Sequence, residues 1–143
     1  MSCKKVNIIH KYIKVSTKYC KHCGEFIRYQ KIRTILSKKY FIDNKENGIF
    51  IQYHENGTIH INGYFINSMI NGEYKWYDEN GNISHKFYYF NYKKNGEYNV
   101  YDENGNIMSK GYYIDDYFNG EYVKYDKYKN VQNKCYCINN CRI

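Results

Sequence analysis

Apolar and aromatic positions recur along this chain with a period of 24 residues, and glycine-marked turns separate the apolar runs. From Gly24 to Ile143, five units follow one another without an insertion: 24–47, 48–71, 72–95, 96–119 and 120–143. The sixth and seventeenth positions of the unit are Tyr in all five copies, and the twelfth is Ile or Val. Because aromatic and β-branched residues favour strands, each unit is predicted to contain about two strands.

The turns of these units are predicted from their Asn-Gly pairs. The three middle units place such a pair between two apolar runs, at Asn56-Gly57, Asn80-Gly81 and Asn104-Gly105. Asn-Gly favours a β-hairpin because the turn needs positive φ, so Gly57, Gly81 and Gly105 are predicted to be structural turn glycines. A second turn must join successive hairpins, and the sequence predicts it at Asn47-Gly48, Asn71-Gly72, Asn95-Gly96 and Asn119-Gly120.

The register of the hairpins has two alternatives. A two-residue loop at Asn80-Gly81 pairs Tyr74 with Phe87, whereas a three-residue loop with a glycine bulge pairs Tyr77 with Ile83. A slip of one residue exchanges the two faces of a strand, and aromatic columns occupy both faces. The bulged form is favoured, because it pairs two columns that hold in all five units.

Stacked hairpins of this kind predict an all-β fold, an elongated, meandering antiparallel sheet in the form of a solenoid. The terminal units lack the Asn-Gly turn and carry Ile32-Arg33 and Tyr128-Lys129 instead, as expected of capping units. Residues 1–23 lie outside the repeat, are rich in lysine, and are predicted to be either a basic N-terminal segment or a degenerate cap, a half-repeat that packs on the first hairpin. Asn7 to Tyr19 is predicted to form one or two strands, and a short basic helix is the alternative.

The composition supports a strand-rich fold and a basic protein. The 143 residues include 20 Tyr, one Leu, no Pro and no Ala, and the net charge is +8. The chain shows neither a secretory h-region nor an apolar run long enough to span a bilayer, so a cytoplasmic location is expected, the host cytoplasm if the source is a virus. In a reducing compartment the six cysteines are expected to be thiols or metal ligands.

The unit Asn-Gly-Glu-Tyr-x-x-Tyr-Asp-Glu-Asn-Gly-x-Ile, at residues 71–83 and 95–107, resembles the MORN repeat, and most closely its variant form from bacteria and large DNA viruses. The resemblance extends over residues 24–143 and is strongest over 48–126. It implies an elongated antiparallel sheet and a scaffolding or protein-binding role, with phosphoinositide binding proposed for some arrays.

Candidate metal sites are outweighed by simpler explanations. Cys20 and Cys23 form a C-x2-C pair, but the thiols near the C-terminus lie about 40 Å away if ten strands are spaced by about 4.8 Å. Cys135 and Cys137 occupy columns that are apolar in other units, and a core role is favoured for them. The Asp78-x-Asn80-x-Asn82 motif lacks the glycine and glutamate spacing of a calcium loop and is explained by a turn.

Nothing in the sequence indicates catalysis, a cofactor or a small-molecule substrate, so a protein scaffold is predicted, with an unknown protein partner and an undetermined oligomeric state. A basic adaptor for an anionic membrane or a nucleic acid is the alternative, carried by the N-terminal lysines. The binding candidates are Trp76, Tyr77, Tyr101, Val100 and Lys124. The fifth unit position is variable in type, so Trp76 is expected to be partly exposed and the Tyr77/Tyr101 column more buried. A Trp that fills a gap in the core is the alternative.

Overall fold

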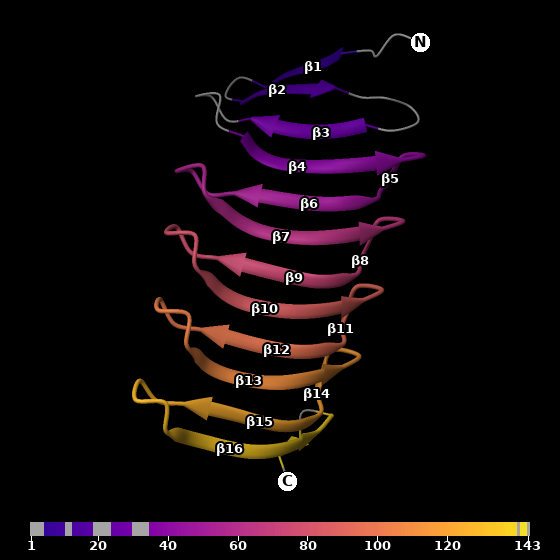
Figure 1. The fold of residues 1–143 in the computed structure, drawn as a ribbon. Helices are drawn as coiled ribbons and strands as arrows, with labels where there is room; N and C mark the ends of the chain where they lie inside the picture. The colour runs from indigo at the N-terminus through magenta and orange to yellow at the C-terminus, as the bar shows by residue number, and fades with distance from the viewer. Residues whose placement is uncertain (1–4, 11–12, 19–23, 30–34, 140, 143) are drawn as a thin grey trace.

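The computed structural model describes the backbone of residues 5–10, 13–18, 24–29, 35–139 and 141–142, and the side chains of residues 36–139. Every regular element of the described residues is a strand, which confirms the all-β prediction. A two-stranded and a fifteen-stranded antiparallel sheet are formed, and the hairpins succeed one another along one axis to give an elongated array (Figure 1). No helix that could cross a bilayer occurs in these residues.

The large sheet repeats three kinds of strand. Six-residue strands begin the units: β3 (Gly24–Tyr29), β6 (Gly48–Tyr53), β9 (Gly72–Tyr77), β12 (Gly96–Tyr101) and β15 (Gly120–Tyr125). Eight-residue strands follow: β4 (Ile35–Ile42), β7 (Ile59–Ile66), β10 (Ile83–Phe90), β13 (Ile107–Ile114) and β16 (Val131–Ile138). Two-residue strands then pair with the end of the long strand before them: β5 (Lys45–Glu46), β8 (Met69–Ile70), β11 (Lys93–Lys94), β14 (Tyr117–Phe118) and β17 (Cys141–Arg142).

The turn between the two long strands is the predicted three-residue loop with a glycine bulge. In the third unit the loop is residues 79–81, and the amide of Gly81 donates a hydrogen bond to the carbonyl of Asp78 (3.1 Å). Gly81 has φ +88°, and Gly57 and Gly105 have φ +89° and +78°. These glycines are needed for their backbone conformation, since a Cβ at any of the three would meet no atom within 4 Å.

The register combines the two pairings that the sequence offers as alternatives. Tyr77 pairs with Ile83 beside the loop, as the bulged form requires. A β-bulge after this pair adds one residue to β10, so Tyr74 also pairs with Phe87. Equivalent shifts occur in all five hairpins. The register is therefore fixed by the turn and the bulge together.

The turn that joins successive hairpins does not lie at the Asn-Gly pairs, and that prediction is wrong. It lies four residues earlier, at residues 43–44, 67–68, 91–92 and 115–116, where both central residues have φ between +47° and +72°. Two consecutive positive φ values define a type I′ turn, and Asp or Asn at the first position tolerates this conformation without glycine.

The Asn-Gly pairs serve instead as kinks between a two-residue strand and the next long strand. Gly96 has φ +127° at such a kink. The preceding amide, that of Asn95, donates to the carbonyl of Tyr88 at 2.8 Å, and the same bond recurs at three other kinks. Pairing with the previous hairpin therefore continues up to the kink.

Neighbouring units are also joined through their turns. The amides of Ser68, Tyr92 and Asp116 donate to carbonyl oxygens of the preceding two-residue strands at 2.7–3.1 Å. On the opposite edge, His54 Nε2 lies 2.9 Å from the carbonyl oxygen of Tyr77, and the Asn56 side chain donates to the carbonyl of Glu79. Each unit thus depends on its neighbours, as in other repeat arrays.

The N-terminal segment contains the strands β1 (Lys5–His10) and β2 (Ile13–Lys18), which pair with each other in the smaller sheet. A hairpin rather than a basic helix therefore occupies this part of the chain. Ile32-Arg33, in the expected cap of the first unit, lies outside the described residues. In the last unit the loop keeps its shape without glycine, because Lys129 adopts φ +66°.

The array is a single layer, so few side chains are fully enclosed. Among the described residues, the buried side chains are Phe65, Phe87, Ser109, Val123 and Cys137. The remaining apolar residues are half-buried or exposed on one of the two faces. Stability must therefore come from cross-strand packing along each face.

Candidate functional site

One face of the sheet collects the aromatic rings. Alternate residues of a strand point to opposite faces, and Tyr74 and Trp76 of β9 share a face with Phe87 and Tyr89 of β10. We call this the aromatic face. It is built from unit positions 3, 5, 14, 16, 18 and 23. Ring contacts continue along it from unit to unit, for example between Phe87 and Tyr98, whose centroids are 5.1 Å apart.

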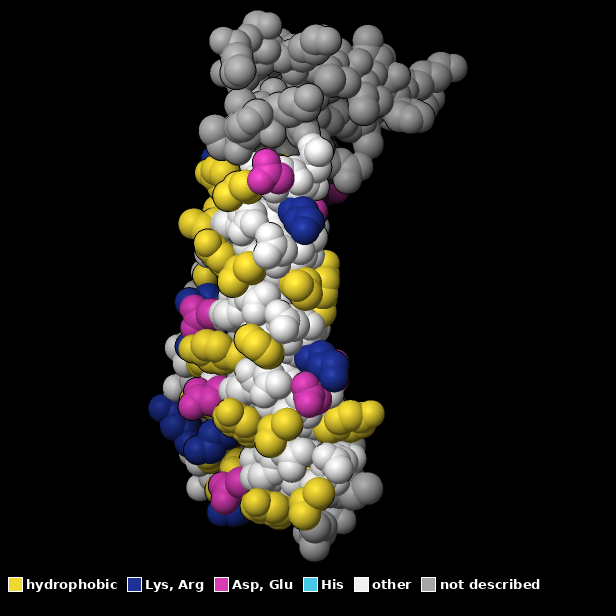
Figure 2. All heavy atoms as spheres, turned by 90° about the vertical axis from the view of Figure 1, so that its right-hand side faces the viewer, with side chains coloured by type: hydrophobic (Ala, Val, Ile, Leu, Met, Phe, Trp, Pro, Cys, Tyr) yellow, Lys and Arg dark blue, Asp and Glu magenta, His cyan; other side chains and the backbone are white. Residues whose placement is uncertain are grey.

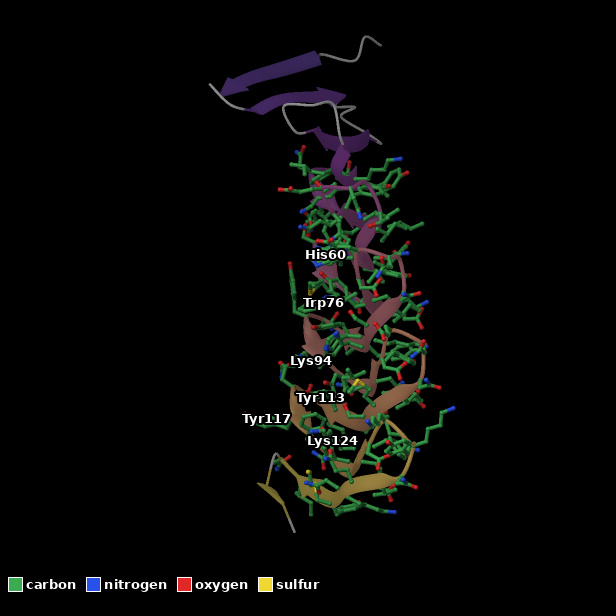
Figure 3. The ribbon with its side chains drawn as sticks, turned by 90° about the vertical axis from the view of Figure 1, so that its left-hand side faces the viewer. His60, Trp76, Lys94, Tyr113, Tyr117 and Lys124 are labelled. Atoms are coloured by element: carbon green, nitrogen blue, oxygen red, sulfur yellow. The ribbon has the colours of Figure 1, made fainter. Side chains whose placement is uncertain are left out.

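Three of the predicted binding residues lie in one row across this face. Trp76, Val100 and Lys124 belong to strands that are separated by one intervening strand each, so they are spaced by about 10 Å. In this row each residue pairs with the next one on the neighbouring strand. The row crosses eight strands, in the order Gln52, Ile61, Trp76, His85, Val100, Ser109, Lys124 and Asn133. Figure 3 shows the labelled Trp76 and Lys124 on the same side of the array.

Trp76 is partly exposed, as predicted. Its exposed fraction is 41%, whereas Tyr77 and Tyr101 are half-buried. The indole lies against His85 and Phe87, with centroid distances of 5.6 and 6.2 Å. A large, positioned and accessible aromatic surface is what binding anchors require.

Tyr77 and Tyr101 do not join the row of Trp76. They end β9 and β12 next to the hairpin loops and pair with Ile83 and Ile107 across the bulge. Their position supports the loops that contain Gly81 and Gly105. The structure therefore separates the five predicted binding residues into a surface row and a pair at the loops.

A groove opens on the aromatic face beside the last two units. It has a volume of about 530 Å³ and is lined by Lys94, Tyr98, Tyr113, Asp116, Phe118, Tyr122, Cys135 and Cys137. The rings of Tyr113 and Phe118 stack at 4.1 Å, and Tyr122 meets Phe118 edge-on at 5.4 Å. Gly111 makes this packing possible, since a Cβ there would come within 3.0 Å of the Phe118 ring.

Lys94 brings a positive charge into this aromatic surface. Its Nζ lies 4.8 Å from the ring centroid of Phe87 and 5.1 Å from that of Tyr113. The two rings therefore hold the ammonium group by cation–π attraction at the rim of the groove. The groove is not evident from the sequence, although the third unit position, which supplies Tyr98 and Tyr122, is aromatic in all five units.

The electrostatics of the aromatic face reflect partial desolvation. Burial raises the pKa of Tyr113 to about 12, with a further contribution from the neighbouring Tyr98. Burial also raises the pKa of Tyr74, Tyr89 and Tyr98. Burial lowers the pKa of His85, so its neutral form is favoured. At neutral pH this surface offers neutral hydroxyl and imidazole groups beside apolar rings.

The opposite face carries a different pattern. The seventeenth and nineteenth unit positions lie there and form two parallel columns, Tyr40, Tyr64, Tyr88, Tyr112 and Tyr136, and Ile42, Ile66, Phe90, Ile114 and Ile138. We call these columns the tyrosine–isoleucine stripe. The tyrosines of the seventeenth position, which recur in all five units, therefore form a ladder on this face. In Figure 2, hydrophobic side chains recur down the length of the array.

Ion pairs border this stripe. Glu73 accepts hydrogen bonds from Lys75 (2.5 Å) and Lys86 (2.6 Å). Burial alone would raise the pKa of Glu73, but the two lysines lower it to about 2. The same contact raises the pKa of Lys86. A second pair joins Glu121 to Lys134 at 2.8 Å.

Among the candidate metal ligands, those that lie within the described residues have a structural role. Cys20 and Cys23 lie outside the described residues. Cys137 is buried and its sulfur lies 3.9 Å from that of Cys135, in agreement with a core role. Residues 36–139 contain no group of three or more side chains placed to hold a metal ion.

The Asp of the calcium-like motif caps the hairpin loop. The Asp78 carboxylate accepts hydrogen bonds from the amides of Asn80 (2.9 Å) and Asn82 (2.8 Å), and Asp102 and Asp126 do the same in their loops. Hydrogen bonds from Asn82 lower the pKa of Asp78. The turn thus uses the oxygens that a calcium ion would need.

The positive charge of the chain lies almost entirely at its N-terminal end. Residues 1–35 contain nine Lys or Arg and one Glu, which gives +8. Residues 36–139 contain twelve Lys and thirteen Asp or Glu, which gives −1, and Arg142 adds +1. The repeat array itself is therefore close to neutral, and both of its faces carry paired rather than uniform charge.

Comparison with known families supports the repeat. Residues 46–67, 70–91 and 94–115 match the family model of the MORN repeat variant. The three matched segments follow one another at intervals of 24 residues, and each starts two residues before a six-residue strand. A search of curated proteins gives no match.

Proposed function

Because residues 46–67, 70–91 and 94–115 match the MORN repeat variant, we propose that the chain is a non-enzymatic scaffold that binds another protein through its aromatic face. MORN repeats are commonly interaction modules. The observation that carries the proposal is the row through Trp76, which continues beside the groove lined by Tyr98, Phe118 and Tyr122. We place this scaffold in the cytoplasm.

The aromatic face suits an extended or helical segment of a partner rather than a small molecule. The groove of about 530 Å³ is open to solvent, and its rings are supported by one another. Aromatic residues that are held rigidly lose little conformational entropy on binding, so they contribute well to an interface. Lys94 and Asp116 both line the groove, so a partner segment that places a carboxylate beside Lys94 and a donor beside Asp116 would complement its charges.

Capture of partners from native extract at two salt concentrations tests the proposal. The intact protein, Trp76→Ala and the control Tyr128→Ala are compared, since Tyr128 is 73% exposed in a hairpin loop of the last unit. A partner that is retained at high salt, lost with Trp76→Ala and kept with Tyr128→Ala supports the scaffold. A partner that binds all three equally contradicts a role for the aromatic face.

A second function is favoured by the charge of the N-terminal end. Residues 1–35 carry +8, which would attract an anionic lipid surface or a nucleic acid. Binding to anionic vesicles or to oligonucleotides would then fall steeply with salt. Replacement of Lys4, Lys5 and Lys11 by Gln would reduce that slope, whereas Trp76→Ala would leave it unchanged.

A further inference from the structure

The tyrosine–isoleucine stripe leaves a large apolar surface uncovered. Nine of its ten side chains have exposed fractions between 42% and 62%, and Tyr88 is half-buried. Large hydrophobic side chains each present about 150–200 Å² when fully exposed, so nine that are about half exposed give on the order of 800 Å². This exceeds the largest apolar patch of a typical monomer, which is about 300–600 Å².

The stripe has the size and the symmetry of a homodimer interface. A standard interface buries about 800 Å² on each partner. A twofold interface places the same patch on both copies, and a stripe of evenly spaced units can be laid against itself in the opposite direction with its units in register. We propose that a second copy of this chain docks face to face on the stripe, in antiparallel orientation.

The distribution of charge selects the antiparallel orientation. Residues 1–35 carry +8, so a parallel pair would bring two strongly basic ends together. In the antiparallel pair, each basic end lies beside the last unit of the other copy, residues 120–143, whose five Lys or Arg and two Asp or Glu give only +3. The repulsion is therefore weaker than between two ends that each carry +8. Residues 36–139 carry −1, so two arrays can approach without net repulsion.

The central unit of the five lies on the twofold axis of this dimer. Its stripe residue Phe90 is the only Phe in a column of Ile and is exposed to 62%, the highest value in the stripe. On the axis, Phe90 meets Phe90 of the second copy, as hot-spot residues near the centre of an interface do.

Two of the carboxylates that border the stripe are already paired, which lowers the cost of burying them. Glu73 is already paired with Lys75 and Lys86, and Glu121 is paired with Lys134, within one copy. Docking therefore leaves these two carboxylates with partners, whereas an unpaired charge would disfavour association.

Sedimentation equilibrium over a hundredfold range of concentration tests the proposal. The intact chain of 17.4 kDa is expected to approach twice that mass as the concentration rises, with little change in high salt. Phe90→Glu places two carboxylates together on the axis and is expected to weaken association at least tenfold. The control Tyr128→Glu introduces the same charge at a more exposed residue outside the stripe and should leave association unchanged.

Two outcomes would overturn the proposal. One is a monomer at every concentration, in which case flotation with neutral phosphatidylcholine vesicles would show a lipid surface to be the occupant of the stripe. The other is a dimer that Phe90→Glu leaves intact although circular dichroism shows the variant to be folded.

Lysine cross-linking tests the orientation. Lys38 and Lys134 lie on the stripe face in the first and last units, so about eight strand spacings, on the order of 38 Å, separate them within one copy. A short reagent is therefore expected to link Lys38 to Lys134 only between copies, and Phe90→Glu should abolish the link. Intermolecular links of Lys38 to Lys38 would indicate a parallel pair and contradict the proposed orientation.

Discussion

The two faces of the array are built from the same ten long strands, yet they differ in how their apolar side chains are used. On the aromatic face, Phe87 contacts the rings of Trp76, His85, Tyr89 and Tyr98 and is 8% exposed. On the other face, three residues further along the same strand, Phe90 is 62% exposed. In a single-layer sheet, one face can pack on itself while the other needs a cover from outside.

This difference predicts unequal effects of the same substitution. Phe87→Ala is expected to lower the free energy of unfolding by about 3 kcal/mol, because the ring is enclosed by others. Phe90→Ala, measured at a concentration where the protein is monomeric, is expected to cost less than about 1 kcal/mol. Urea unfolding of both variants measures the difference, and equal losses would contradict the assignment of the faces.

The register that separates the faces depends on the glycine of the hairpin loop. Gly81→Val is expected to destabilise by about 2 kcal/mol, because a β-branched residue at φ +88° is strained. Lys129→Gly at the equivalent position of the last unit should stabilise by about 1 kcal/mol, since Lys129 adopts φ +66°. Opposite shifts of the thermal midpoint are expected, and shifts of the same sign would show that the loops differ.

The stripe face should respond to acid through Glu73. Its pKa is lowered to about 2 by Lys75 and Lys86, so its contribution to stability is complete above pH 4.5, its ordinary value, and is lost as the pH falls towards 2. Because the pair is partly exposed, the loss is expected to be only about 0.5 kcal/mol. Glu73→Gln should remove this part of the acid dependence. An unchanged profile in the variant would contradict the ion-pair assignment.

The smallest expected effect concerns two histidines. Burial lowers the pKa of His60 and His85, with a further contribution from His54 at His60. Folding therefore favours their neutral forms, and stability should decline as the pH falls below about 6.5, the ordinary value. The thermal midpoint is expected to fall slightly between pH 7.5 and 5.5, and less so in His60→Gln/His85→Gln. A thermal midpoint that rises as the pH falls from 7.5 to 5.5 would contradict the predicted direction.

Much of the fold could be predicted from the sequence because the same unit occurs in five copies, which can be compared position by position. The 24-residue period, the loops at Gly57, Gly81 and Gly105 and the bulged pairing of Tyr77 with Ile83 all follow from columns shared between units. The prediction of the turns that join successive hairpins is wrong because these turns contain no glycine. Asp or Asn at the first turn position is a weaker sign of positive φ than glycine, and Tyr92 at the second position is no sign of it at all.

The candidate site was predicted only in part. The exposure of Trp76 follows from the variety of residues at its unit position, and the Tyr ladder follows from its column. The groove at Tyr98 and Phe118 could not be derived, since it depends on which rings meet across three strands and on the space that Gly111 leaves. Such packing depends on side-chain directions that periodicity alone does not give.

Site-specific photo-cross-linking tests the central claim, that the two faces serve different partners. A photoreactive phenylalanine derivative is placed at residue 76 in one sample and at residue 90 in the other, each in the full chain in native extract. We predict a cross-link from residue 76 to a different protein and from residue 90 to a second copy of this chain. The reverse assignment, or the same product from both positions, would contradict the account.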